Sequence, residues 1–337
     1  MLFGMILRPK PSPRHAVEPL GAAPIAPVAT VPSWLRRAVE TSQTLEDAAI
    51  ASGAALGALD AVVRRQEKWA GTWRQRLALT AAAASARQVG RAEDEVALRD
   101  AVLLTRPGDD VGPAGSLLLA WRRLVVQPAE KLLTEAVLAS VLGEVGLASD
   151  DEAASDLAAD LRALSGTQGG ITMLSGAFAI AGRHGFGRNL GAWFADALIA
   201  QRLGWRHALP VLGAQAGSVG SLRRVRPPMG GGSERGAMVD AERLHLLGAQ
   251  ARAALWAIDL SAELGRRAER LIAVAPKLRA NGSDLVVEKL LSHDALVASQ
   301  PVVGMSDRGL RRLFDRLVDL GAVRELSGRT AFRIYGL

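Results

Sequence analysis

The sequence predicts a mainly α-helical protein that ends in a small α+β domain with the element order of a winged helix-turn-helix. Three observations support this fold class. The composition is 49% hydrophobic but only 4% aromatic, so the apolar side chains are mostly Ala, Leu and Val, which suit closely packed helices. Apolar residues recur at helical spacing through most of the chain. The last fourteen residues instead alternate apolar with basic residues around a Ser-Gly pair, which is typical of a β-hairpin.

Three regions are predicted. Residues 1–32 contain seven prolines, which disfavour both helix and sheet, so we expect a flexible tail. Residues 33–275 form the helical domain, and residues 276–337 form the winged helix-turn-helix domain, entered through the linker APKLRANGSD. The length of 337 residues also favours more than one domain, because single cores usually stop growing at roughly 250 to 300 residues.

Within the helical domain, periodicity predicts a series of helices separated by Gly- and Pro-rich breaks. The first convincing helix begins near Leu45, and WAGTWRQRLALTAAAASARQVG follows it. The loop RPGDDVGPAG and the glycine-rich residues 166–191 interrupt the pattern. Further helices are expected at residues 92–104, 115–124, 129–144, 150–164, 192–205 and 237–275.

The strongest local pattern is an amphipathic helix in GMSDRGLRRLFDRLVDLGAV. Ser306 is a favourable N-cap, and Gly321 is placed to end the helix. The opposite, charged face carries its arginines mainly in the first half, where the helix dipole disfavours cations. This order suits a recognition helix that meets phosphates and base edges, and the alternative is a solvated charged face. The apolar face is expected in the core: Leu310, Leu313, Phe314, Leu317 and Val318.

The elements before this helix complete a helix-turn-helix. DLVVEKLL is an amphipathic first helix, and DALVAS is a possible short second helix. The connection QPVVG is longer and more apolar than the tight turn of most helix-turn-helix motifs. The predicted order is therefore helix, short helix, basic helix and hairpin.

The hairpin occupies the position of the wing. Pairing around Ser327-Gly328 places Val323 opposite Phe332 on one face, and Ile334 continues inward. The basic side chains then point to the other face, with Arg329 at the tip. We expect one DNA-binding surface made by the arginines of the helix and the wing: Arg308, Arg311, Arg312, Arg316, Arg324, Arg329 and Arg333.

The run SDRGLRRLFDRLVDLGAVRELSGRTAFRIYGL resembles the winged-helix ends of several bacterial families, including the module attached to some Fic-type proteins. It most resembles the terminus of the uncharacterised domain-of-unknown-function family 1403. That resemblance extends over most of the chain, through AALGALDAVVRR and LIAVAPKLRANGSD. The family implies an organisation but no activity. The chain lacks a His-Pro-Phe-x-x-Gly-Asn-Gly-Arg run, so the Fic resemblance does not imply adenylyl transfer.

Charge and hydropathy narrow the class of protein. Lys and Arg number 41 against 34 Asp and Glu, and the net charge of +7 is compatible with a nucleic-acid partner. The absence of Cys excludes disulfides and thiolate metal sites. The best apolar run, residues 171–181, is shorter than the roughly 20 residues of a membrane span, and the N-terminal run MLFGMIL precedes its positive charges, unlike a secretory signal. We therefore expect a cytoplasmic protein.

No catalytic constellation is found, and no cofactor is expected. The five histidines show no i, i+4 pair and no acidic partner at metal-ligand spacing. GRHGFGRNLGAW misses the dinucleotide fingerprint by one position, which favours a glycine turn. Trp69 and Trp73 lie one helical turn apart and suit core packing better than base stacking. The candidates for a divalent cation are three acidic clusters that are also typical of helix starts and loops: residues 93–95, 109–110 and 150–152.

These observations lead to a DNA-binding protein, either a regulator or an accessory factor of a mobile element. Its helical domain would bind a protein partner, a ligand or a second protomer. The alternative hypothesis is a protein–protein adaptor whose winged helix is architectural. A third hypothesis is a metal-dependent enzyme that acts through the acidic clusters. Salt-dependent DNA binding distinguishes the first hypothesis from the second.

Overall fold

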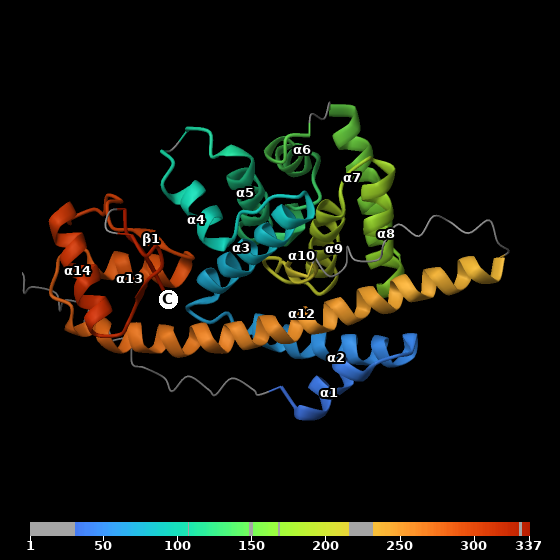
Figure 1. Cartoon of the computed structure of the whole chain (residues 1–337), viewed down its shortest axis with the longest axis horizontal. Helices are drawn as coiled ribbons and strands as arrows, with labels where there is room; N and C mark the ends of the chain where they lie inside the picture. The colour runs from blue at the N-terminus through green and yellow to red at the C-terminus, as the bar shows by residue number, and fades with distance from the viewer. Residues whose placement is uncertain (1–30, 107, 148–150, 168, 216–231, 330–331) are drawn as a thin grey trace, which may run out of the picture. The chain divides into compact units, whose positions relative to one another are not determined.

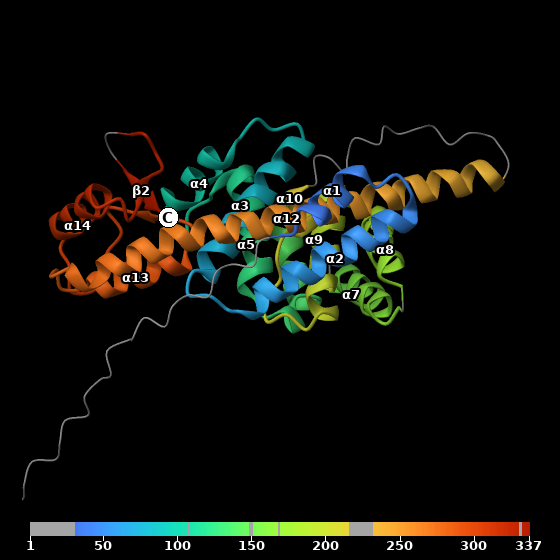
Figure 2. The same ribbon diagram turned by 90° about the horizontal axis from the view of Figure 1, so that it is seen from below.

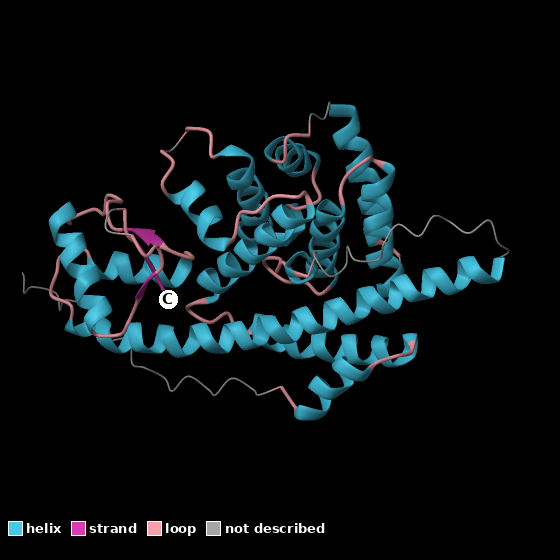
Figure 3. Cartoon of the chain, viewed as in Figure 1, coloured by secondary structure: helices cyan, strands magenta, loops and turns pink. Residues whose placement is uncertain are grey.

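The computed structural model describes residues 31–106, 108–147, 151–167, 169–215, 232–329 and 332–337. Val31–Leu337 form one compact unit. Most of this unit is helical, and three short strands lie near the C-terminus (Figure 3), which confirms the predicted fold class. The predicted tail, apart from its last two residues, lies outside the described residues. No described helix combines the length and the apolar character that a membrane span requires.

The helices have the following bounds in chain order: α1 Ser33–Thr41, α2 Leu45–Arg64, α3 Ala70–Gln88, α4 Glu95–Leu103, α5 Gly112–Val126, the 3-10 turn η1 Ala129–Lys131, α6 Glu135–Glu144, α7 Asp151–Ser165, α8 Gly170–Arg183, α9 Arg188–Arg202, α10 Val211–Ala214, α12 Gly232–Val274, the 3-10 turn η2 Ala275–Lys277, α13 Ser283–Ser292 and α14 Asp307–Asp319.

Helix α3 contacts α4, α5, α10, α12 and α13 and so organises the core (Figure 1). Its Ala-rich second half is buried almost throughout, because small side chains let neighbouring helices approach closely. The Trp121 Nε1 of α5 donates to Ser85 Oγ at 2.9 Å, and Trp73 Nε1 donates to the Ala257 carbonyl of α12 at 2.9 Å. Trp69 and Trp73 are both buried, as core packing predicts.

Helix α12 is a single long helix, and α2 packs along it (Figures 1 and 2). In their interface the buried Ser52 hydroxyl donates to Gln250 Oε1 at 2.6 Å. The helix begins at Gly232, five residues before the start predicted at residue 237. Once a helix exists, each added turn costs little, so weak helix formers at its start are tolerated. Residues 216–231, which precede the helix, lie outside the described residues.

The glycine-rich region between residues 166 and 191 contains α8 and the turn into α9. Gly185 has φ +73°, a left-handed conformation that favours glycine, and the Phe186 N–H donates to the Ala181 carbonyl at 2.7 Å. Helix α9 then begins at Arg188. The predicted glycine turn is confirmed.

Residues 283–337, which we call the C-terminal segment, contain α13, α14 and the sheet. Strands β1 (Leu296–Val297), β2 (Arg324–Glu325) and β3 (Ile334–Gly336) are antiparallel in the order β1-β3-β2. Helix α14 begins and ends as its sequence predicts. The Gly309 N–H donates to Ser306 Oγ at 3.2 Å, and Gly321 follows the helix with φ +63°.

The apolar face of α14 packs on the sheet. Phe314 stacks on Tyr335 with ring centroids 4.4 Å apart, and both side chains are buried. Leu310, Leu313 and Leu317 are buried with them. The expectation that Val318 lies in the core is wrong, since this residue is 39% exposed. It lies at the edge of the apolar stripe, next to the exposed Asp319.

The prediction of a short helix in DALVAS is wrong. Within the described residues, α13 and α14 are separated by β1 and turns. Leu296 pairs with Tyr335 and Val297 with Ile334, so this stretch finds its hydrogen-bond partners in β3 instead of within itself. A two-helix helix-turn-helix is therefore not formed by these residues.

The predicted hairpin exists, but its predicted register is wrong. Arg324 pairs with Gly336 and Glu325 with Tyr335, so Val323 does not face Phe332. The connection between β2 and β3 is longer than a two-residue turn. Burial of Ile334 and Tyr335 against β1 and α14 determines this register, and these are contacts distant in sequence.

The C-terminal segment shares its core with the helical region. Thr72 Oγ1 of α3 donates to the Leu290 carbonyl of α13 at 2.7 Å. A Cβ at Gly71 would lie 2.6 Å from Ser292 Cα, so the two helices touch through glycine. The predicted domain boundary at residue 275 falls at η2, between α12 and α13, and stays a prediction.

Candidate nucleic-acid interface

Helix α14 presents its arginines on the face opposite the sheet. Arg308, Arg311, Arg312 and Arg316 are exposed, and none of them forms an ion pair with another described residue. Spacings of three and four residues place them on one side of the helix. The helix is held rigidly, because its apolar face is buried.

The charge of this face changes along the helix. The first half carries three arginines against one acid, Asp307. The second half carries Arg316 against Asp315 and Asp319. Positive potential is therefore concentrated at the N-terminal end of α14, which is also the positive end of the helix dipole.

The hairpin arginines all lie near acids. Arg333 Nη1 lies 3.9 Å from Asp315 Oδ1 of α14, and both side chains are exposed. The pKa of Arg333 is raised first by its hydrogen bond with Tyr335 and further by nearby negative charge. Arg333 and Arg311 line one cleft, so the structure brings these two predicted residues together.

The other two hairpin arginines are directed at the helical region. Arg324 Nη2 lies 3.7 Å from Glu263 Oε1 of α12. Arg329 forms an ion pair with Asp100 of α4, whose carboxylate is mostly buried. Arg329 was expected at the tip of the wing on the DNA-binding surface, and the structure pairs it with Asp100. The two side chains therefore attach the hairpin to the helical region.

A buried ion-pair network was missed at the sequence level. The Asp294 carboxylate, which is fully buried, accepts a hydrogen bond from Arg99 Nε of α4 at 2.6 Å and another from Arg76 of α3. Burial raises the pKa of Asp294, but the two arginine charges and their hydrogen bonds outweigh it and lower the pKa to about 2. The sequence signal was weak, because the Asp of DALVAS looks like a helix start.

A third arginine lies near this network. Burial lowers the pKa of Arg122 of α5, the charge of Asp294 opposes that shift, and the charge of Arg99 adds to it. Its Nε atom is buried with no hydrogen-bond partner among the described residues. Three arginines, from α3, α4 and α5, therefore lie around the Asp294 carboxylate.

The acidic clusters have structural contacts. Asp94 Oδ1 accepts the Ala97 N–H at 2.9 Å as the N-cap of α4. Asp110 Oδ1 accepts the Gly112 N–H at 2.8 Å. Asp150 lies outside the described residues. In the described part of the chain no three His, Asp or Glu side chains are grouped as metal ligands.

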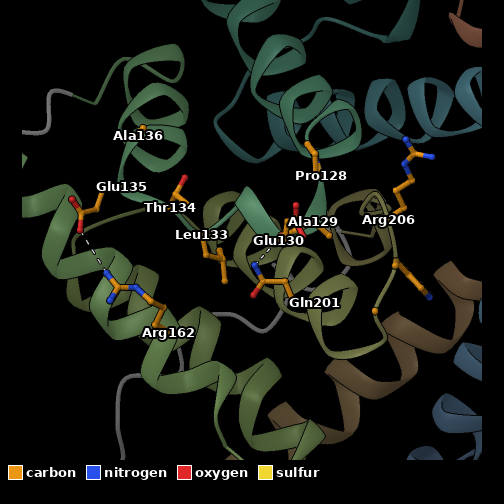
Figure 4. A pocket seen from close by; sticks show the side chains of 12 residues that line it. Pro128, Ala129, Glu130, Leu133, Thr134, Glu135, Ala136, Arg162, Gln201 and Arg206 are labelled. Carbon is orange, nitrogen blue, oxygen red and sulfur yellow. Dashed lines mark hydrogen bonds and ion pairs between the residues drawn. The ribbon is translucent and has the colours of Figure 1, made fainter.

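A cavity of about 1,100 Å³ lies between η1, α6, α7 and α9 (Figure 4). Arg162 Nη2 lies 3.6 Å from Glu135 Oε1 at this cavity (Figure 4). Gln201 Nε2 donates to the Ala129 carbonyl at 2.9 Å. These polar groups satisfy one another, and the wall carries both signs of charge. Its chemistry therefore favours no particular small ligand.

The comparison with family models confirms the resemblance to family 1403, whereas no comparison supports the resemblance to the winged-helix ends of Fic-type and other bacterial proteins. The model of a family described as "Protein of unknown function (DUF1403)" matches residues 24–337. No curated protein and no solved structure matches the chain.

Proposed function

We propose that this chain, which belongs to the DUF1403 family of proteins of unknown function, binds duplex DNA through the N-terminal half of α14. One observation carries the proposal. Arg308, Arg311 and Arg312 are exposed on one rigid helix face and form no ion pair with any described residue. A helix stabilised only by its own charges would place such cations at the opposite end.

The proposed roles follow from the surroundings of each arginine. Arg311 and Arg312 neutralise phosphates or donate to guanine edges, which are the preferred partners of guanidinium groups on DNA. Arg333, beside Arg311, extends this surface onto the hairpin. Arg324 and Arg329 hold the hairpin on α12 and α4 and contribute little to DNA affinity.

Binding of the intact protein to duplex DNA over a range of salt concentrations tests the proposal. Fluorescence anisotropy should show log affinity falling linearly with log salt, since each phosphate contact releases counterions. Binding that is undetectable at low salt would reject the proposal.

An adaptor is the second candidate function. The cavity of about 1,100 Å³ between η1, α6, α7 and α9 is the observation that favours it. In that case a protein partner binds the helical region and α14 is only a solvated helix. If the correctly folded protein does not bind DNA, the adaptor is supported.

A further inference from the structure

A cleft of about 350 Å³ in the C-terminal segment lies between α14, the residues that follow β1, and β3 with the two residues before it. Its volume is in the range of small-ligand sites, roughly 300 to 1,000 Å³. The side chains that define its chemistry are Ser299, Arg311, Asp315, Phe332, Arg333 and Tyr335.

The cleft carries an excess of positive charge. Arg311 forms no ion pair with any described residue, whereas Arg333 lies 3.9 Å from Asp315. Two guanidinium groups therefore face one carboxylate. A ligand with an anionic group completes the charge balance, and phosphate suits the planar fork of arginine.

The second feature is an exposed aromatic ring. Phe332 is 66% exposed, although Ile334 and Tyr335, two and three residues later, are buried. Its φ is +54°, in the left-handed region that bulky residues avoid. The ring gains little from burial and the backbone is strained, so folding alone does not explain a phenylalanine here.

The base of the cleft is ordered. Tyr335 is buried and stacks on Phe314 with an angle of 7° between the ring planes. The Ile334 N–H donates to Ser327 Oγ at 3.3 Å, and this hydrogen bond holds the start of β3. Phe332 and Arg333 therefore directly precede an anchored strand.

We infer that this cleft binds one unstacked nucleotide of single-stranded DNA, with the base on Phe332 and the phosphate between Arg311 and Arg333. Aromatic side chains stack on any base, and cations along the same groove follow the backbone. The inference deepens the proposed function, on which it rests, because Arg311 serves both surfaces. The negative charge of Asp315 repels inorganic phosphate, and inorganic phosphate has no base that could stack on Phe332 to offset this repulsion.

Anisotropy with a short oligothymidylate and with a duplex of the same length tests the inference. Replacing Phe332→Ala should weaken oligothymidylate binding about tenfold, within the range for loss of one stacked base, and change duplex affinity less than twofold. Phe332→Tyr should retain binding. Trp34→Ala, which removes another exposed aromatic ring, is the matched control.

Phe332→Gly separates stacking from stability. Glycine adopts positive φ readily, so the thermal midpoint of the Phe332→Gly protein should equal or exceed that of the parent. Its oligothymidylate binding should fall as in Phe332→Ala. Parent protein that does not bind oligothymidylate, or Phe332→Ala protein that binds it as the parent does, would overturn the inference. If the parent protein binds oligothymidylate but not duplex, and Phe332→Ala weakens the oligothymidylate binding, only the duplex proposal is rejected.

Discussion

Arg99 of α4 donates a 2.6 Å hydrogen bond to Asp294, the fully buried carboxylate between α13 and β1. Arg76 of α3 pairs with the other carboxylate oxygen. One acid thus connects two helices of the helical region to the C-terminal segment. This contact fixes where α14 and the hairpin stand relative to α3 and α4.

Replacing Asp294→Asn should destabilise the protein by about 3 to 5 kcal/mol, because it leaves two buried arginines without their counter-charge. Urea unfolding measures this loss. Asp259→Asn removes the exposed pair with Arg36 and should cost no more than about 1 kcal/mol. Equal effects of the two substitutions would show that burial of the Asp294 pair does not matter.

Because of Asp196, we expect the free energy of unfolding to depend on pH in an unusual way. Burial raises the pKa of this fully buried residue of α9 to about 8, although the N–H groups of Gly213 and Leu212 donate to it and oppose the shift. An unfolded Asp has a pKa of about 3.9. Between these values the folded chain holds a proton that the unfolded chain has lost, so stability falls as pH rises.

Asp196→Asn should therefore flatten the pH profile between about pH 4 and 8, by up to about 1.4 kcal/mol per pH unit. Urea unfolding of parent and variant at several pH values gives the two slopes. The variant is also destabilised at every pH by its poorer acceptor, so only the slopes are compared. Parallel profiles would mean that Asp196 is ionised throughout.

Gly71 tests the approach of α3 to α13. Gly71→Ala should destabilise by about 1 to 3 kcal/mol, because the new methyl group would lie 2.6 Å from Ser292 Cα, a backbone atom that moves only with its helix. Gly57→Ala is the control, since nothing lies within 4 Å of its Cβ position on α2. It should stabilise by up to about 1 kcal/mol. Stabilisation by both substitutions would contradict the observed contact.

Substitution of Arg329 tests whether this residue attaches the hairpin to the helical region or binds DNA. Arg329→Ala should leave the salt dependence of duplex binding nearly unchanged, because its guanidinium is engaged by Asp100. Arg311→Ala should lower the slope of log affinity against log salt by about 0.9. Slopes reduced equally by the two substitutions would place Arg329 on the DNA-binding surface.

Local sequence was sufficient to predict α14. Ser306, Gly321 and the spacing of the apolar residues act within one helix, so the pattern alone locates its ends. The exposure of Arg311 and Arg312 follows from the same pattern. These are also the residues on which the proposed function depends.

The sheet and its partners were not predictable in the same way. β1 forms because residues far along the chain, Ile334 and Tyr335, supply its hydrogen-bond partners. The surroundings of Arg329 depend on Asp100, more than two hundred residues earlier. Sequence periodicity contains no information on such long-range pairs.

The central claim is that α14 contacts DNA phosphates, and the salt dependence of duplex binding tests it most directly. Arg311→Ala combined with Arg312→Ala should flatten the slope of log affinity against log salt by about two. The matched control is Arg37→Ala combined with Arg87→Ala, which removes two exposed arginines from α1 and α3 and should leave the slope unchanged. An unchanged slope in a correctly folded Arg311 and Arg312 double variant would contradict the claim.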